Sequence, residues 1–199
     1  HYPLRRQRQM CIRDRYNRCG LEMGVFMRSK KDQKLYDKTR EYLEKIGDSN
    51  IEERMKVVDK VLEKTDKEER YSYLYDLICD YLDQEFREKD ICGFCHDLCK
   101  RRRDMMERKI KKDTYINGCC HSYVKNADCP HLKKGGGCDI KNIGCKTFTC
   151  FYLRKQGIRY SLNKIYLARY FFNARQKFYM ENTFFVDKSV IMEGIMKRG

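Results

Sequence analysis

The sequence predicts a mainly α-helical protein, in which a helical hairpin or small bundle carries an irregular, cysteine-rich, metal-binding insert. Two observations lead to this fold class. Apolar residues recur at helical spacing before residue 90 and after residue 160, and the chain holds only two prolines. Nine of the 12 cysteines lie between Cys92 and Cys150. The cysteines therefore mark a site and not a general bias of composition.

Length and composition exclude several classes of protein. A chain of 199 residues is long enough for one domain with a modest core, or for a small domain with a helical attachment. Mean hydropathy is −0.83, and no apolar run approaches the ~18–20 residues of a membrane span. No secretory signal peptide is evident, so we expect a cytoplasmic protein without a membrane partner. In a reducing compartment, clustered thiols bind metal or carry out redox chemistry more often than they form disulfides.

Residues 1–15 are left out of the fold prediction. The chain begins at His1 without a methionine, so we expect a truncated reading frame. The arginine-rich run from Arg5 to Arg15 resembles translated sequencing-adapter sequence, which recurs at the ends of metagenomic reading frames. Cys11 is excluded with this run. The alternative is a disordered basic arm that binds nucleic acid.

Charge divides the rest of the chain into parts. Residues 16–90 hold 16 basic and 19 acidic side chains and form the predicted acidic helical region. Residues 91–155 form the predicted cysteine-rich metal-binding region, and residues 156–199 the basic, aromatic C-terminal helices. The net charge is +5 over residues 91–140 and +9 over residues 141–199. The basic surface therefore belongs to the cysteine-rich region and to the C-terminal helices.

Amphipathic helices are expected throughout the acidic region. The first covers residues 32–46 and is stopped by Gly47. Ser49 and Glu52 are the capping-box pair of the second helix. The third helix covers residues 66–89, and its apolar stripe consists of Leu74, Leu77, Ile78, Tyr81, Leu82 and Phe86.

The cysteine-rich region carries the predicted metal site. The CxxC pair of Cys92 and Cys95 lets two thiolates turn toward one metal ion, and Cys99 follows about one helical turn later. Cys79 lies outside this region, and we interpret it as a buried core residue because free cysteine is readily buried. The candidate ligands are Cys92, Cys95, Cys99, Cys119, Cys120, Cys129, Cys138, Cys145 and Cys150, with His96, His121 and His131 as additional ligands.

The number of ligands favours zinc. A closed tetrahedral zinc site takes four ligands, so nine cysteines suffice for two such sites. Iron–sulfur clusters held by four thiolates are the alternative, although the run of cysteines typical of bacterial ferredoxins is absent. An odd number of cysteines argues against a disulfide-bonded domain.

The later cysteines form recognisable motifs: Cys119-Cys120, Cys129-Pro130-His131-Leu132, Gly137-Cys138-Asp139-Ile140 and Cys145-Lys146-Thr147-Phe148. Their order resembles a family of zinc- or iron-chelating proteins with a CxxCxxCC hallmark, whose members run from a CC pair through C-P-x-L and C-x-I stretches to C-[RK]-x-F. The resemblance covers residues 92–150 and implies that these cysteines bind zinc or iron. In this chain Cys95 lies 24 residues before Cys119, where the family has two or three, and Ile143-Gly144 replaces an Arg-Pro pair.

Some members of this family are linked to lysine N-methylation of flagellin. The resemblance therefore makes an iron or iron–sulfur protein in redox or protein-modification chemistry one alternative function. We find no site for S-adenosylmethionine in the sequence. We also find no nucleophile with a base and an orienting residue, so no catalytic residue is predicted.

A run of cations follows Cys92, Cys95 and Cys99. On a helix over residues 100–112, these cations could lie along the phosphates of a nucleic acid. A nucleic-acid-binding zinc protein, which would also use the C-terminal region, is therefore a further alternative, and its binding would weaken with salt. We prefer a solvated basic face, because no aromatic residues for base stacking are interleaved with the cations. These cations are Lys100, Arg101, Arg102, Arg103, Arg108, Lys109, Lys111 and Lys112.

The C-terminal part is expected to be helical again. Ser161 is the predicted cap of a helix that runs to Met180, and Asp187 or Ser189 the cap of the last helix. An aromatic stripe of Phe171, Phe172 and Phe178 is expected to pack in the core. The expected partners are a metal ion and either nucleic acid or another protein.

Overall fold

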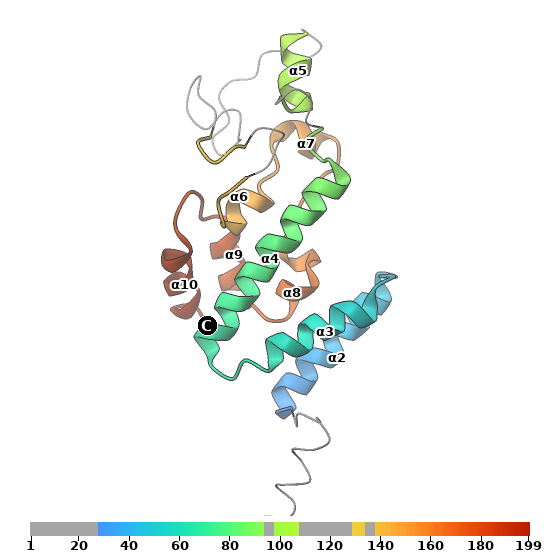
Figure 1. Ribbon diagram of the computed structural model, residues 1–199, viewed down its shortest axis with the longest axis vertical. Helices are drawn as coiled ribbons and strands as arrows, with labels where there is room; N and C mark the ends of the chain where they lie inside the picture. Colours follow the sequence, from blue (N-terminus) through green and yellow to red (C-terminus); the bar gives the residue numbers. More distant parts are fainter. Residues whose placement is uncertain (1–27, 94–97, 108–128, 134–137) are drawn as a thin grey trace, which may run out of the picture. The chain divides into compact units, whose positions relative to one another are not determined.

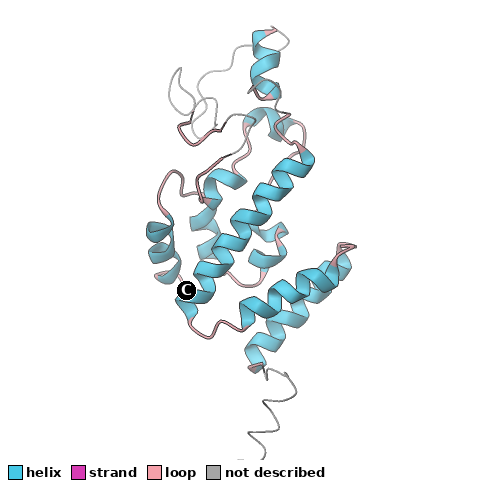
Figure 2. Cartoon of the chain, in the orientation of Figure 1, coloured by secondary structure: helices cyan, strands magenta, loops and turns pink. Residues whose placement is uncertain are grey.

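The computed structural model describes residues 28–93, 98–107, 129–133 and 138–199 (Figure 1). Among these residues the regular structure is helical, and extended backbone pairs only in isolated bridges such as that between Leu132 and Cys138 (Figure 2). The mainly α-helical class is therefore confirmed. The elements are α2 (Lys30–Lys45), α3 (Ile51–Leu62), α4 (Lys67–Lys89), α5 (Lys100–Met106), α6 (Ile143–Thr147), α7 (Phe151–Lys155), the 3-10 helix η2 (Leu162–Lys164), α8 (Tyr166–Arg169), α9 (Ala174–Glu181) and α10 (Lys188–Met196).

The described residues divide into two units, 28–34 and 35–199. In the first unit, the hydroxyl group of Ser29 accepts a hydrogen bond from the N–H of Asp32 at 3.1 Å. A serine therefore caps the start of α2, as helix N-termini prefer. The core and the candidate site both lie in the second unit.

The turn between α2 and α3 corrects one prediction. Gly47 follows α2 with a φ of 66°, a left-handed conformation that glycine adopts without steric cost. The predicted capping box of Ser49 and Glu52 is wrong, because α3 begins after Asn50 and no side-chain cap hydrogen bond forms there. The carboxylate of Asp48 accepts the N–H of Asn50 instead, at 2.9 Å.

Helix α4 packs against α3, α6, α8 and α10. The side chain of Asp66 accepts the N–H of Glu69 at 2.7 Å and caps the helix where the sequence predicts its start. Leu74, Ile78 and Leu82 are all 0% exposed, which confirms the central part of the apolar stripe. Cys79 is also fully buried in this core, as predicted.

The sequence predicts one continuous helix from Ser161 to Met180, and this prediction is wrong because the helix is interrupted. Ser161 caps only η2, and Ile165 is extended, so the chain turns before α8. A capping box between Asn173 and Gln176 then starts α9 as a separate helix. The apolar periodicity alone predicts one helix, and local side-chain capping divides it into separate short helices.

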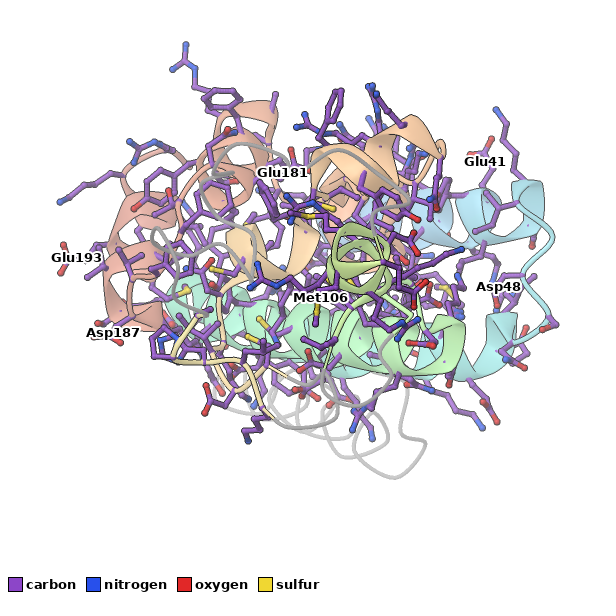
Figure 3. The ribbon with its side chains drawn as sticks, turned by 90° about the horizontal axis from the view of Figure 1, so that it is seen from above. Glu41, Asp48, Met106, Glu181, Asp187 and Glu193 are labelled. Atoms are coloured by element: carbon purple, nitrogen blue, oxygen red, sulfur yellow. The ribbon has the colours of Figure 1, made fainter. Side chains whose placement is uncertain are left out.

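The aromatic residues of this part are divided between core and surface. Phe171 and Phe172 are buried, and the ring of Phe172 stacks on Tyr71 with centroids 5.1 Å apart. Phe178 is 69% exposed, which corrects the prediction that it packs in the core. Asp187 precedes α10 as predicted, but its side chain makes no cap hydrogen bond. In Figure 3, Asp187 and Glu193 project outward from α10.

Candidate metal centre

Six of the nine candidate cysteine ligands lie within the described residues, and they fall into two groups. The α5–α7 cysteine group is Cys92, Cys99 and Cys150, and the α6 cysteine group is Cys129, Cys138 and Cys145. The remaining candidates lie outside the described residues, namely Cys95, Cys119, Cys120, His96 and His121. None of these six cysteines forms a disulfide with another described cysteine.

Backbone contacts bring the members of the α5–α7 cysteine group together. Cys99 and Cys150 are the residues immediately before α5 and α7. The carbonyl oxygen of Cys92 accepts the N–H of Lys100 at 2.8 Å, which ties the first cysteine to the start of α5. Cys92 also packs against a small apolar cluster formed by Cys150 and Leu153.

A side-chain hydrogen bond joins α5 to α7. The hydroxyl group of Tyr152 donates to the carboxylate of Asp104 at 2.6 Å. The two short helices therefore hold Cys99 and Cys150 near each other, and the Cys150 thiol contributes to a raised pKa of Cys99.

The α6 cysteine group is built around a narrow hairpin. Leu132 and Cys138 form an antiparallel bridge, and the N–H of Asp139 donates to the carbonyl oxygen of His131 at 3.2 Å. The N–H of Leu132 donates to the carbonyl oxygen of Cys129 at 3.0 Å, so Cys129 lies at the base of the same hairpin.

Cys145 reaches this hairpin from α6. The side chain of Asn142 accepts the N–H of Cys145 at 2.9 Å and caps the helix. Burial raises the pKa of Cys145 to about 11, and the neighbouring thiols of Cys138 and Cys129 act in the same direction. The hairpin and α6 therefore hold three thiols as neighbours.

Backbone N–H groups face the sulfur atoms in both groups. Burial raises the pKa of Cys99 and of Cys138, while N–H donors at the sulfurs, from Arg102 and from Ile140 respectively, act to lower it. The N–H of Phe185 faces the sulfur of Cys145 in the same way. Phe185 has a φ of 56°, a left-handed conformation that is strained for an aromatic residue. Donors of this kind stabilise a charged sulfur over a neutral thiol.

A buried cation accompanies each cysteine group. Arg101, beside Cys99, is 3% exposed, and its charge favours the thiolate form of Cys99. The side chain of Lys146, beside Cys145, is also 3% exposed and pairs with Asp83 of α4 at 2.5 Å. The charge of Lys146 acts to lower the pKa of both Cys138 and Cys145. Burying a cation is costly unless negative groups lie close to it.

The burial of these two cations is not predicted from the sequence, where Arg101 is read as part of a basic face and Lys146 only as a motif residue. Asp83, the partner of Lys146, directly follows the buried Leu82 in α4, but Asp80 follows the buried Cys79 in the same way and its side chain is 63% exposed. Position beside the apolar stripe therefore does not identify the buried pair.

The sulfur atoms are neighbours without forming a coordination sphere. Within the described ranges, no three Cys, His, Asp or Glu side chains are close enough together to hold a metal ion. The additional ligand His131 has its Nδ1 atom 2.9 Å from Asp139 in a half-exposed pair. Its second ring nitrogen is the one that the pairing with Asp139 leaves for a metal ion.

The basic run forms a shorter helix than predicted. Helix α5 ends at Met106, which is 66% exposed and is seen on this helix in Figure 3. Two of its cations are engaged within the protein, because Arg101 is buried and Arg103 donates to the carbonyl oxygen of Leu98 at 3.1 Å. Lys100 and Arg102 are exposed. The other candidate contacts to nucleic acid lie outside the described residues, namely Arg108, Lys109, Lys111 and Lys112.

Comparison of the chain with protein-family models, with curated proteins and with solved structures gives no match. Membership of the zinc- or iron-chelating family therefore stays a prediction. Of the helices in the described part of the chain, none combines the length and the apolar character needed to cross a membrane.

Proposed function

We propose that this protein binds zinc through the cysteines of residues 92–150 and uses the metal to stabilise that region. The observation that carries the proposal is the grouping of the described cysteines by backbone contacts. The carbonyl oxygen of Cys92 accepts the N–H of Lys100, which follows Cys99, and Cys129 and Cys138 lie on segments joined by the bridge between Leu132 and Cys138. Clustered thiols of this kind are the usual ligands of structural zinc ions.

The donors present fit zinc. Cysteine thiolates are the preferred ligands of structural zinc sites. The N–H groups that face Cys99, Cys138 and Cys145 would orient and stabilise such thiolates. The bound ion would supply crosslinks between segments that share few apolar contacts.

The packing around these cysteines supports a crosslinking role. Among the described residues, the apolar cluster around the α5–α7 cysteine group contains two buried residues, Cys150 and Leu153, with half-buried neighbours. So small a cluster contributes little to stability, and metal binding can supply the missing folding free energy. A structural role therefore suits this site better than catalysis, for which no constellation is found among the described residues.

Elemental analysis of the full chain, purified without oxygen, tests the proposal. We expect a colourless protein that retains zinc through gel filtration, and a Cys79→Ala control that retains the same amount. Cys79 is the matched control because it is a buried cysteine of the helical core. A metal-free protein would contradict the proposal. A brown protein that contains iron would also contradict it and would indicate an iron–sulfur centre.

A further inference from the structure

We propose that an open cavity beside α6, α7 and the end of α9 binds a small phosphate monoester that carries an aromatic ring, the chemistry of a nucleoside monophosphate. The cavity has a volume of about 370 Å³. Pockets for small ligands typically measure about 300–1,000 Å³. The lining combines two guanidinium groups with aromatic rings. Ligand binding at this cavity does not depend on the proposed zinc function.

Three segments of the chain line the cavity. They are residues 147–149 between α6 and α7, residues 154–160 at and beyond the end of α7, and residues 181–184 at the end of α9. Helices α6 and α9 pack against each other. Segments that are far apart in the sequence therefore face one space.

Close contacts hold these segments in place. A Cβ atom at Gly144 of α6 would lie 2.3 Å from the carbonyl oxygen of Thr183, a distance that leaves no room for a side chain. The carboxylate of Glu181 accepts the N–H of Leu162 at 2.6 Å, which ties the end of α9 to the chain that follows α7. The walls of the cavity are therefore formed before a ligand binds, as in most small-molecule sites.

The two guanidinium groups belong to Arg154 and Arg159. Within the described ranges, neither side chain forms a hydrogen bond or an ion pair. Lys155, which follows Arg154, instead lies over the ring of Phe151 at 4.6 Å from its centroid. Arginine binds phosphate oxygens through paired N–H donors. Two unpaired arginines that line one cavity therefore favour an anionic ligand.

The charge of Glu181, which also lines the cavity, is already engaged. One carboxylate oxygen accepts the N–H of Leu162. Burial lowers the pKa of Lys177, and the charge of Glu181 opposes this shift, so this carboxylate acts on a cation of its own. The charges of the two arginines remain for the ligand. A phosphate monoester carries a charge of about −1.5 to −2 at pH 7, which matches them better than the single charge of a carboxylate.

Aromatic rings form the second part of the site. Phe148 and Phe184 are both half-buried and meet edge to face, with centroids 6.0 Å apart. Tyr160 is held by stacking on Phe86 of α4, with centroids 5.0 Å apart. Rings of this kind offer faces on which a planar ligand can stack, and such stacking does not select one base. The lining therefore suits a class of aromatic phosphates and not one particular nucleotide.

Titration calorimetry of the full chain with adenosine monophosphate tests the proposal. We expect saturable binding, and much weaker binding of adenosine and of inorganic phosphate, since each offers only one part of the ligand. Arg154→Gln and Arg159→Gln should each weaken binding of adenosine monophosphate about 10- to 100-fold, because each removes charged hydrogen bonds to the phosphate. Arg175→Gln is the matched control, because Arg175 is an exposed arginine of α9 outside the cavity.

Phe184→Leu separates the two parts of the site. This variant should bind adenosine monophosphate about 5-fold more weakly or worse, because base stacking is lost, and should bind inorganic phosphate as the wild type does. Phe178→Leu is the matched control, because Phe178 is 69% exposed and does not line the cavity. Equal weakening of both ligands by Phe184→Leu would overturn the role of the rings.

Two results would overturn the whole proposal. One is the absence of binding of adenosine monophosphate, and the other is equal weakening by Arg154→Gln and Arg175→Gln, which would indicate general attraction of anions to a basic protein. If a variant loses its helical circular dichroism, the wild type decides, because adenosine monophosphate must raise its melting temperature more than adenosine does. The zinc content of the folded variants should stay that of the wild type, so failure of this site leaves the proposed function intact.

Discussion

The helical core and the cysteine-rich region are stabilised in different ways. In the core, side chains of α2, α3, α4, α6, α8, α9 and α10 meet in one apolar cluster, and many of them are 0% exposed. Among the described residues of the cysteine-rich region the apolar cluster is small, and thiols, backbone N–H groups and two buried cations lie close to it or to α6. Apolar packing tolerates approximate matches of size and shape, whereas a metal site depends on particular atoms. The two regions should therefore respond to different perturbations.

The largest expected effect is on the core. Ile78→Ala removes a fully buried side chain from α4 and should lower the free energy of unfolding by about 2–5 kcal/mol. Urea unfolding followed by circular dichroism measures this loss, with and without a chelator. The zinc content of the folded variant should stay that of the wild type. A change in zinc content would mean that the two regions are not energetically separate.

Gly144→Ala perturbs the contact between the regions. Its Cβ atom cannot fit against the carbonyl oxygen of Thr183, so we expect a loss of about 1–3 kcal/mol from overpacking. Zinc should also be bound more weakly, because the close approach at Gly144 positions the candidate ligand Cys145 on α6. Gly157→Ala is a control for glycine replacement, because no atom lies within 4 Å of its added Cβ, although its φ of 80° is itself strained for alanine. Equal zinc loss in both variants would contradict the role assigned to Gly144.

Tyr75→Phe removes a hydroxyl group that joins α4 to the segment before α6. This hydroxyl group accepts from the N–H of Ile143 at 3.1 Å and donates to the carbonyl oxygen of Lys141 at 3.3 Å. We expect a loss of about 1–2 kcal/mol, because a buried N–H is left without its partner. Thermal unfolding measures this loss of stability. Tyr73→Phe, on the half-buried side of α4, should lower the melting temperature much less. An unchanged melting temperature would show that the contact contributes nothing.

A further effect is expected only at alkaline pH, and none near neutrality. Burial raises the pKa of Cys79 to about 12 from an ordinary value of 9.0, so the folded state holds this proton more tightly than the unfolded state. The resulting contribution to stability is complete below pH 9 and is lost as pH rises toward 12. Urea unfolding in the presence of a chelator should therefore give Cys79→Ala a shallower decline between pH 9 and 11 than the wild type. Identical slopes would show that Cys79 has no share in alkaline unfolding.

The apolar pattern was sufficient to predict the core helices and insufficient to predict their interruptions. The stripe of α4 and the buried Cys79 follow from periodicity, because burial of one helix face is a local property of the sequence. The breaks at Ile165 and before Asn173 depend on capping hydrogen bonds that compete with a continuous helix. The exposure of Phe178 depends on where the short α9 is placed after those breaks.

The sequence by itself determined the helical class, the membership of the α4 stripe and the concentration of thiols after residue 91, since these follow from periodicity and composition. Only the tertiary structure decided which described cysteines are neighbours and which cations are buried beside them. Arg101 and Lys146 look like ordinary surface cations in the sequence, yet both are buried, and Lys146 is buried where α6 packs against α4 and pairs with Asp83. Long-range proximity of this kind depends on how helices pack, and residue spacing along the chain carries no record of it.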